Sequence, residues 1–247
     1  MKAKDFLIPI VLAGAAGWFI LQQTDTSIVA PQHEPVAPNW VAIAAWPEAE
    51  IAAVEAQPDP NRRVTAIVLD DSGSMGGDME AAKQAVVDAL AAMQDSDRVS
   101  VVALNSGIVM PFTSVADARG TLPNSLRPII SDGGTPLTQA LGSAQTLLEE
   151  EAGSVRGFGT FRMIVTTDGV ADDSEALNRA VEQLAATTPI QLTTIGIGIS
   201  GNHVLRRSDL GSFVDVDNVD ALEAALQAAV AENTDFTAIT DFSESEG

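Results

Sequence analysis

The 247-residue chain carries 34 Asp and Glu against 13 Lys and Arg, a formal net charge of -21, and it contains no Cys. This charge argues against binding to nucleic acid, which needs a basic surface, and the lack of Cys excludes disulfides, thiolate metal sites, a catalytic Cys and an acylated lipoprotein Cys. Apolar residues make up 46% of the chain but aromatic residues only 4%, so we expect a sizeable core built from Ala, Val, Leu and Ile.

An uncharged, mostly apolar run covers residues 6–21, shortly after Lys2 and Lys4. As a helix it spans about 24 Å, slightly less than a bilayer core, and the polar residues that follow can extend it at the interface. No other Lys or Arg occurs before Arg62, so the positive-inside rule places the N-terminus in the cytoplasm and the remainder in the periplasm or outside the cell. We therefore predict that residues 1–22 form the transmembrane anchor of a single-pass membrane protein.

The same run also has features of a cleavable signal peptide, with Ala13-Gly14-Ala15 as the small residues of a cleavage site. Cleavage there leaves Trp18 and further apolar residues near the start of the mature protein, which is an unusual beginning. The retained anchor is therefore the favoured interpretation. Both interpretations export the rest of the chain, and cleavage predicts a secreted protein.

Residues 23–61 are rich in Pro and Ala, a composition typical of an extended, semi-stiff linker. Trp40, Ile43 and Trp46 interrupt this composition. We expect them to pack a short helix against the following domain or against the membrane interface. A segment that docks a partner is the alternative.

From residue 62, apolar runs of strand length alternate with segments whose apolar residues recur every three or four positions. Most of the strand segments are continuous runs of apolar or β-branched residues, as expected for strands covered on both faces, so the alternation indicates an α/β domain with a largely parallel sheet. The segment 234–247 is acidic and contains few apolar residues, which predicts a disordered tail. Strands are predicted at 64–69, 99–104, 108–112, 161–166, 190–199 and 213–216, and helices within 79–93, 116–122, 137–148, 177–184 and 222–230.

Asp70, Ser72 and Ser74 occupy alternate positions directly after the predicted strand at 64–69. Their carboxylate and hydroxyl oxygens can gather around one point, and hard divalent cations such as Mg²⁺ prefer oxygen ligands. On their own, the two serines are also typical of a helix cap or a turn.

Two further loops carry oxygen-bearing side chains beside predicted elements. Thr135 lies in Gly-Gly-Thr-Pro, directly before the helix within 137–148, and Asp168 follows the strand at 161–166. In sheets of this class ligands bind at the carboxyl ends of the strands, where loops converge. We therefore expect Thr135 and Asp168 to lie at the same end of the sheet as Asp70.

Together, Asp70-x-Ser72-x-Ser74, Thr135 in Gly-Gly-Thr-Pro-Leu and Asp168 in Thr-Thr-Asp-Gly resemble the metal-ion-dependent adhesion site of von Willebrand factor type A domains. The resemblance covers residues 62–233 and includes Thr-Ile-Gly-Ile-Gly at 194–198. It implies a Rossmann-like, doubly wound, mostly parallel sheet of about six strands flanked by helices, with the metal at the carboxyl ends of the strands.

The resemblance also implies a role for each residue of the set. Ser72 and Ser74 bind the cation directly, Thr135 binds it directly or through water, and Asp70 and Asp168 supply negative charge, partly through bridging water. Such hydroxyl-rich ligands leave the ion under-neutralised, so one position stays open for a Glu or Asp carboxylate of a protein partner. Mg²⁺ is the expected ion because it keeps water ligands and takes few carboxylates, and Mn²⁺ or Ca²⁺ can replace it in vitro.

Four other acidic residues lie close to these motifs in the sequence. Asp71 should point away from its neighbours on an extended chain, either behind the ligands or at the surface. Asp132 is predicted to be a solvated loop residue, and Asp172 and Asp173 to form the acidic start of the next helix.

No set of residues in the sequence predicts an enzyme. His33 and His203 lack ligand spacing and a matching nucleophile motif, so both are interpreted as surface or packing residues, and there is no Gly-rich phosphate loop with a Lys. We expect a membrane-tethered extracytoplasmic module that binds a protein through the metal. The alternatives are a secreted adhesin or a pilus or surface-assembly component that uses the same site, and less favourably a metal-dependent phosphohydrolase.

Overall fold

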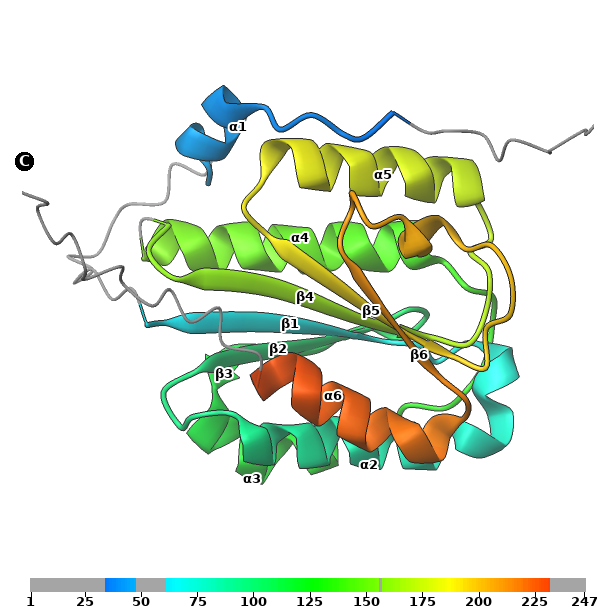
Figure 1. Ribbon diagram of the computed structural model, residues 1–247. Helices are drawn as coiled ribbons and strands as arrows, with labels where there is room; N and C mark the ends of the chain where they lie inside the picture. The colour runs from blue at the N-terminus through cyan, green and yellow to red at the C-terminus, as the bar shows by residue number, and fades with distance from the viewer. Residues whose placement is uncertain (1–33, 48–60, 156, 232–247) are drawn as a thin grey trace, which may run out of the picture. The chain divides into compact units, whose positions relative to one another are not determined.

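The computed structural model describes residues 34–47, 61–155 and 157–231, and their helices and strands belong to one compact unit, Pro35–Gly247 (Figure 1). Short 3₁₀ helices (η) supplement the regular elements. The strands are β1 (Arg63–Leu69), β2 (Arg98–Ala103), β3 (Gly107–Ser114), β4 (Thr160–Thr167), β5 (Gln191–Ile197) and β6 (Ser212–Val216). The helices are α1 (Trp40–Ala45), η1 (Gly73–Asp78), α2 (Met79–Ala89), η2 (Leu90–Ala92), α3 (Val115–Leu126), α4 (Leu137–Ser154), α5 (Ser174–Thr187), η3 (Val204–Arg206), η4 (Val219–Ala221) and α6 (Leu222–Ala231).

The strands of the described residues form a 6-stranded sheet in the order β3-β2-β1-β4-β5-β6. Each neighbouring pair is parallel except β2 and β3, which pair antiparallel. The predicted α/β class with a mostly parallel, six-stranded sheet is therefore confirmed. The sheet is mixed because β3 reverses direction at one edge.

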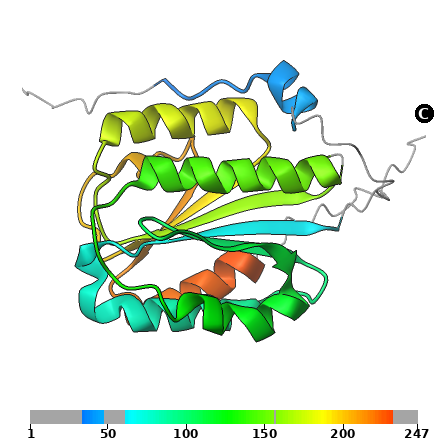
Figure 2. The same ribbon diagram turned by 180° about the vertical axis from the view of Figure 1, so that it is seen from behind.

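Strand β1 lies at the centre of the sheet and is covered on both faces. Val64, Ala66 and Val68 pack in a core with α4 and α5, whereas Ile67 and Leu69 pack in a second core with α2, α3 and α6. Figures 1 and 2 show these two helical layers on opposite faces of the sheet. Burial on both faces is the reason why apolar residues occupy both faces of this strand rather than alternate with polar ones.

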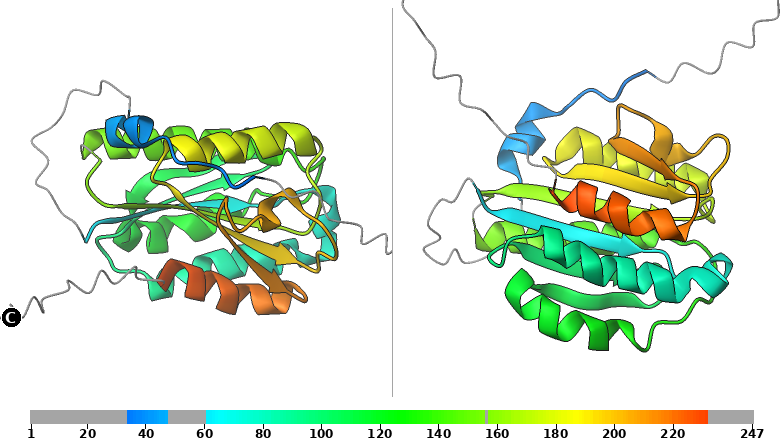
Figure 3. Two further views of the ribbon diagram at one scale, coloured as in Figure 1. Left: turned by 45° about the horizontal axis from the view of Figure 1, so that its top comes forward. Right: turned by 60° about the horizontal axis from the view of Figure 1, so that its bottom comes forward.

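The helices of each layer lie side by side. On one face α2 lies between α6 and α3 (Figure 3, right), and on the other α4 and α5 are neighbours (Figure 2). The connecting loops lie at the ends of the strands, and residues 70–72 join the carboxyl end of β1 to η1.

The predicted elements are all present, with shifted ends. Strand β5 was expected to reach residue 199 but ends at Ile197, where Gly198 takes a φ of 62° that an extended strand does not allow. Helix α3 was expected to end near Leu122 but continues through Pro123 to Leu126. Leu122 and Leu126 are both buried and four positions apart, so packing favours the longer helix.

Residues 34–47, predicted as part of the linker at 23–61, contact the sheet and its helices. The backbone N–H of Asn39 donates to the carbonyl of Ala186 at 2.8 Å. The ring of Trp46 packs edge-on against Phe161 with 4.8 Å between ring centres. Trp40, in contrast, is 71% exposed. The predicted short helix is therefore present as α1, and Trp46 rather than Trp40 holds it to the domain.

Within the described ranges, no helix is both long enough and apolar enough to cross a bilayer. The transmembrane helix predicted from residues 6–21 and the tail predicted at 234–247 lie outside these ranges.

Candidate metal centre

The segment after β1 is fixed by buried polar contacts. Asp70 is 0% and Ser72 1% exposed. The backbone N–H of Asp70 donates to the hydroxyl of Thr166 on β4 at 3.3 Å, and Asp70 Oδ1 accepts the backbone N–H of Ser72 at 2.9 Å. Helix η1 begins directly after Ser72, and its Met75 is buried in the core beside α2. These contacts hold Ser72 and Ser74 at the carboxyl end of β1.

Four of the five predicted residues form one hydrogen-bonded group. The hydroxyl oxygens of Ser72 and Ser74 lie 3.0 Å apart, and the Ser74 hydroxyl donates to Asp168 Oδ1 at 2.7 Å. Asp70 Oδ2 accepts the hydroxyl of Thr167 at 2.8 Å and the backbone N–H of Asp168 at 3.4 Å. The loops after β1 and β4 therefore bring two hydroxyls and two carboxylates together.

The fifth residue, Thr135, reaches the same place on a third loop. The backbone N–H of Gly73 donates to the carbonyl of Gly133 at 3.1 Å, which ties this loop to η1. Thr135 is buried, and its hydroxyl oxygen lies 3.6 Å from the position that a Cβ atom would take at Gly169. The Thr135 hydroxyl therefore contacts the loop that carries Asp168.

The site has an excess of negative charge. Burial raises the pKa of Asp168 above its ordinary value of 3.8, the hydrogen bond from Ser74 lowers it, and the nearby charge of Asp70 raises it further. Among the described residues, none of the ion pairs involves Asp70 or Asp168. Two carboxylates are thus held together without a protein cation, an arrangement that a bound cation relieves.

This set of oxygens fits a hard divalent cation. The described residues hold no group of three or more His, Cys, Asp or Glu side chains that could bind a metal. Here, however, three hydroxyls accompany two carboxylates, and oxygen donors of this kind suit Mg²⁺, Mn²⁺ or Ca²⁺ rather than softer metals. The site therefore has the donors for a magnesium-like ion, but too few acidic residues to resemble a carboxylate cage.

Asp71 is neither a ligand candidate nor a surface residue. It is 0% exposed, and its carboxylate accepts the backbone N–H groups of Asn105 and Ser106 at 2.7 and 3.0 Å, together with the Ser106 hydroxyl at 2.6 Å. The Asn105 side-chain amide also donates to Asp71 and to the carbonyl of Gly134 at 2.9 Å. Asp71 thus holds the turn between β2 and β3, and through Asn105 this turn holds the loop of Thr135. The surface alternative for Asp71 was wrong.

Asp172 and Asp173 play different roles. Asp173 caps α5, as predicted, by accepting the backbone N–H of Ala176 at 2.8 Å. Asp172 does not take part in the helix start in this way. Its carboxylate accepts the backbone N–H of Thr135 at 3.0 Å, and its own N–H donates to the Thr135 carbonyl at 3.1 Å. Asp172 therefore joins the Thr135 loop to the Asp168 loop, a contact that sequence position did not reveal.

Two further interpretations of the loops can be compared with the structure. Asp132 is exposed and accepts the N–H of Gly133 at 2.8 Å, as expected for a loop residue. Ser72 stands at the N-cap of η1, but its side chain makes no capping hydrogen bond and instead contacts Ser74. The helix-cap alternative therefore does not describe Ser72.

His203 is a buried packing residue, as expected, but it also contacts the loop that carries Asp168. Its Nδ1 accepts the backbone N–H of Leu205 at 3.1 Å, so Nε2 carries the proton and donates to the carbonyl of Gly169 at 3.2 Å. Burial lowers the pKa of His203, the hydrogen bond to Gly169 raises it, and Arg206 lowers it. His203 therefore fixes the residue that follows Asp168. His33 lies outside the described residues.

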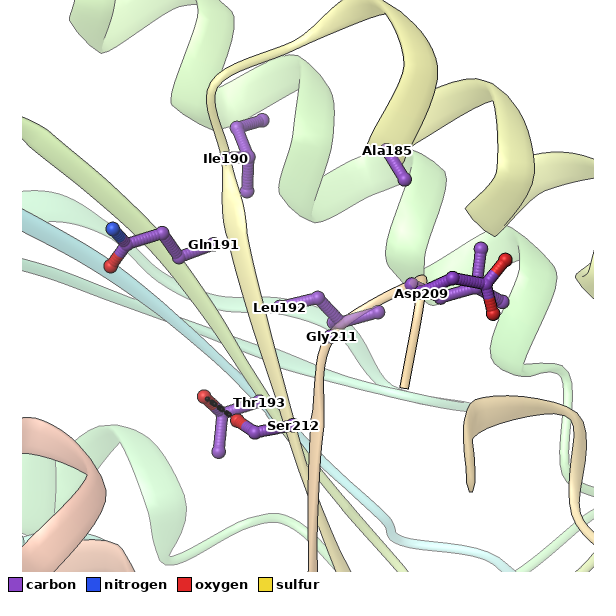
Figure 4. Close-up of a pocket in the computed structure, with 9 residues that line it drawn as sticks. Ala185, Ile190, Gln191, Leu192, Thr193, Asp209, Gly211 and Ser212 are labelled. Atoms are coloured by element: carbon purple, nitrogen blue, oxygen red, sulfur yellow. Dashed lines mark hydrogen bonds between the residues drawn. The ribbon is translucent and has the colours of Figure 1, made fainter. Parts of the chain in front are cut away.

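A separate cavity of about 430 Å³ lies where β5 and β6 begin, beside the end of α5 (Figure 4). Strands β5 and β6 are parallel to β4, so this cavity is at the opposite end of the sheet from Asp168. Its charged side chain, Asp209, is already bound to Arg207 and to the backbone N–H of Val36. Gly211 is required there, because a Cβ atom would clash with the Leu192 carbonyl oxygen. The cavity is therefore separate from the candidate metal centre.

The sequence matches the family model of the von Willebrand factor type A domain over residues 66–245. A search of curated protein sequences finds no match.

Solved structures share the fold at low sequence identity. A von Willebrand factor type A protein from Catenulispora acidiphila is 22% identical with a TM-score of 0.59, and the match covers 69% of this chain but only 42% of that protein. The VWA domain of SpRpn10 is 16% identical with a TM-score of 0.54, over 67% of this chain and 93% of that domain. The manganese-loaded TRAP protein of Plasmodium vivax is 18% identical with a TM-score of 0.53, over 71% of this chain and 76% of that protein.

Proposed function

The chain belongs to the von Willebrand factor type A domain family, and we propose that it holds a divalent cation in its loop cluster and binds a protein partner through that cation. Domains of this family commonly bind protein partners and are typically binding modules rather than enzymes. The cation proposed for this chain is Mg²⁺, with Mn²⁺ or Ca²⁺ as substitutes. A neighbour in fold, the TRAP protein, is described as manganese-loaded, which makes a divalent cation plausible here.

The roles of the five residues follow from their chemistry. The hydroxyls of Ser72 and Ser74 would hold the ion, and Thr135 would add a third hydroxyl. Asp70 and Asp168 supply the negative charge that attracts the cation into the site. When bound, the ion supplies a positive centre that attracts a Glu or Asp carboxylate of the partner.

One observation carries this proposal, the contact between Ser72, Ser74 and Asp168. The Ser74 hydroxyl lies 3.0 Å from the Ser72 hydroxyl and 2.7 Å from the carboxylate of Asp168 on a distant segment, and no ion pair of the described residues involves Asp168 or the buried Asp70. A turn or a helix cap does not require a carboxylate from another loop. A cation site does, because its ligands must converge from several directions.

We further propose that residues 6–21 anchor the chain in a membrane with the N-terminus in the cytoplasm, and that the domain acts in the periplasm or outside the cell. Release after signal-peptide cleavage is the alternative. The charge distribution of the first 62 residues supports export in either case, since its Lys residues all precede the apolar run. A reporter fused after residue 247 tests the orientation, because we expect activity only outside the cytoplasm and cytoplasmic activity contradicts it.

Affinity capture from membranes tests the binding function. We expect the full chain to retain a partner in Mg²⁺ and to release it when EDTA removes the ion. Asp70→Ala should retain none, whereas Asp217→Asn, which removes an exposed carboxylate on a different loop, should behave as the unchanged chain. Equal retention by Asp70→Ala, or retention that EDTA does not affect, contradicts the proposal.

A further inference from the structure

Two strongly exposed aliphatic side chains belong to the loops that supply the proposed cation site. Val170 is 61% and Ile130 69% exposed. Exposed aliphatic residues are common on protein surfaces when scattered singly, but side chains of this kind beside a binding site are typical of interaction surfaces.

Val170 lies on the loop that supplies Asp168. The residue two positions before it, Asp168, accepts the Ser74 hydroxyl at 2.7 Å, and the residue two positions after it, Asp172, accepts the Thr135 backbone N–H at 3.0 Å. Val170 is therefore held between two residues that contact the site, and its side chain is left exposed.

Ile130 lies on the loop that supplies Thr135. Two positions later, the backbone N–H of Asp132 donates to the carbonyl of Asp71 at 2.9 Å. The next residue, Gly133, accepts the N–H of Gly73 at 3.1 Å. Ile130 thus lies two and three positions before the residues that bond to the segment of Ser72 and Ser74, on a different loop from Val170.

The negative charges around the site restrict which partner residues can lie beside the bound carboxylate. Asp78 and Asp132 are exposed on η1 and on the Thr135 loop, and Asp172 is exposed on the Asp168 loop. One partner carboxylate can be neutralised by the cation, but further acidic groups beside it would face these three carboxylates. The flanks of the partner carboxylate must therefore be uncharged or basic, and the exposed Ile and Val favour aliphatic groups.

We propose that the site recognises a carboxylate flanked by aliphatic side chains on a protein partner, with Val170 and Ile130 as the specificity-determining contacts. This inference rests on the proposed function, because the carboxylate is taken to bind the cation. The cation supplies the attraction for the acidic residue, and the two aliphatic side chains discriminate among acidic residues by their neighbours.

Three peptides test this inference, namely acetylated and amidated Leu-Asp-Leu, Gly-Asp-Gly and Glu-Asp-Glu. Their affinities for the full chain in lipid nanodiscs are measured by calorimetric titration in Mg²⁺ and in EDTA, with empty nanodiscs as the blank. We expect Leu-Asp-Leu to bind about fivefold more tightly than Gly-Asp-Gly in Mg²⁺, which corresponds to burying about one methylene equivalent of apolar surface, and Glu-Asp-Glu to bind most weakly.

Matched variants assign the preference to the two residues. Val170→Ser and Ile130→Ser should each lower the ratio of the Leu-Asp-Leu to Gly-Asp-Gly affinities by about twofold, while Mg²⁺ binding stays unchanged. Val41→Ser is the control, since Val41 is 81% exposed but lies on α1. If Leu-Asp-Leu and Gly-Asp-Gly bind with equal affinity and both need Mg²⁺, this inference is wrong, but the proposed binding through the cation is not contradicted. If no peptide binds in a Mg²⁺-dependent way, both proposals fail.

Discussion

The hydroxyl of Ser74 donates a hydrogen bond to the carboxylate of Asp168 at 2.7 Å, although the two residues are 94 positions apart in the sequence. The bond joins the loop after β1 to the loop after β4. Neighbouring parallel strands make it possible, because their carboxyl ends lie at one edge of the sheet. The same bond places a hydroxyl and a carboxylate oxygen where a single cation can meet both.

Replacing Asp168 by Asn should stabilise the protein without metal. Burial and the charge of Asp70 raise the pKa of Asp168, so in the folded state its ionised form is disfavoured relative to the unfolded chain. Above the ordinary pKa of 3.8, this charge therefore opposes folding, and Asn removes it while still accepting the Ser74 hydroxyl. We expect a melting temperature a few degrees higher in EDTA at pH 7.

The same variant should lose the stabilisation that Mg²⁺ gives to the unchanged chain. Asp217→Asn serves as the control for removing one negative charge, and this variant should still be stabilised by Mg²⁺. An Asp168→Asn protein that melts lower than the unchanged chain in EDTA would contradict the electrostatic account of the site.

Asp71→Ala should destabilise the fold by about 2–4 kcal/mol in urea unfolding without metal. The carboxylate is fully buried and accepts hydrogen bonds from Asn105 and Ser106, so its loss leaves several donors of the turn without partners. Asp132→Ala, which removes an exposed carboxylate two positions before Gly134, should change stability by less than about 0.5 kcal/mol. Similar losses in both variants would show that the buried carboxylate has no special role.

The stability of the domain should fall as the pH drops below 6.5, partly through His203. Burial holds the pKa of His203 below the value of 6.5 found in an unfolded chain, so the unfolded state takes up a proton first. The contribution is complete above pH 6.5 and is lost between this value and the lower pKa of the folded state. Urea unfolding from pH 8 to pH 5 should show a smaller pH dependence in His203→Gln, because the Gln amide cannot be protonated in this range.

The other histidine, His33, is present in both proteins and cancels in that comparison. If the two unfolding free energies fall in parallel with decreasing pH, His203 is not the group that responds.

The strands and helices could be predicted because the local pattern of apolar residues in each segment reflects how that segment is buried. Val64–Leu69 carries apolar residues on both of its faces, as expected for a strand that is covered on both sides, and the helices repeat their apolar residues every three or four positions. The position of Thr135 and Asp168 beside Asp70 could be expected for the same reason, since each follows or precedes a recognisable element. The ends of elements were less predictable, because packing extends α3 and a single backbone angle ends β5.

The residues that support the site could not be predicted, because their partners are distant in sequence. Asp71 accepts hydrogen bonds from Asn105 and Ser106, which lie 34 and 35 positions later in the sequence. Asp172 accepts one from Thr135, which lies 37 positions earlier. His203 binds the carbonyl of Gly169 across 34 positions. Nothing in the neighbouring residues distinguishes these side chains from surface acids or a packing His, so only the three-dimensional arrangement assigns their roles.

Titration of the metal-free protein with Mn²⁺, followed by electron paramagnetic resonance, tests the central claim most directly. We expect the unchanged chain to bind a single Mn²⁺ that Mg²⁺ displaces, and Ser72→Ala with Ser74→Ala to bind it about 10–100-fold more weakly. The matched control, Ser125→Ala with Ser143→Ala, removes two partly exposed hydroxyls of helices α3 and α4 and should bind as the unchanged chain does. Equal Mn²⁺ affinity in all three proteins would show that these loops do not form a cation site.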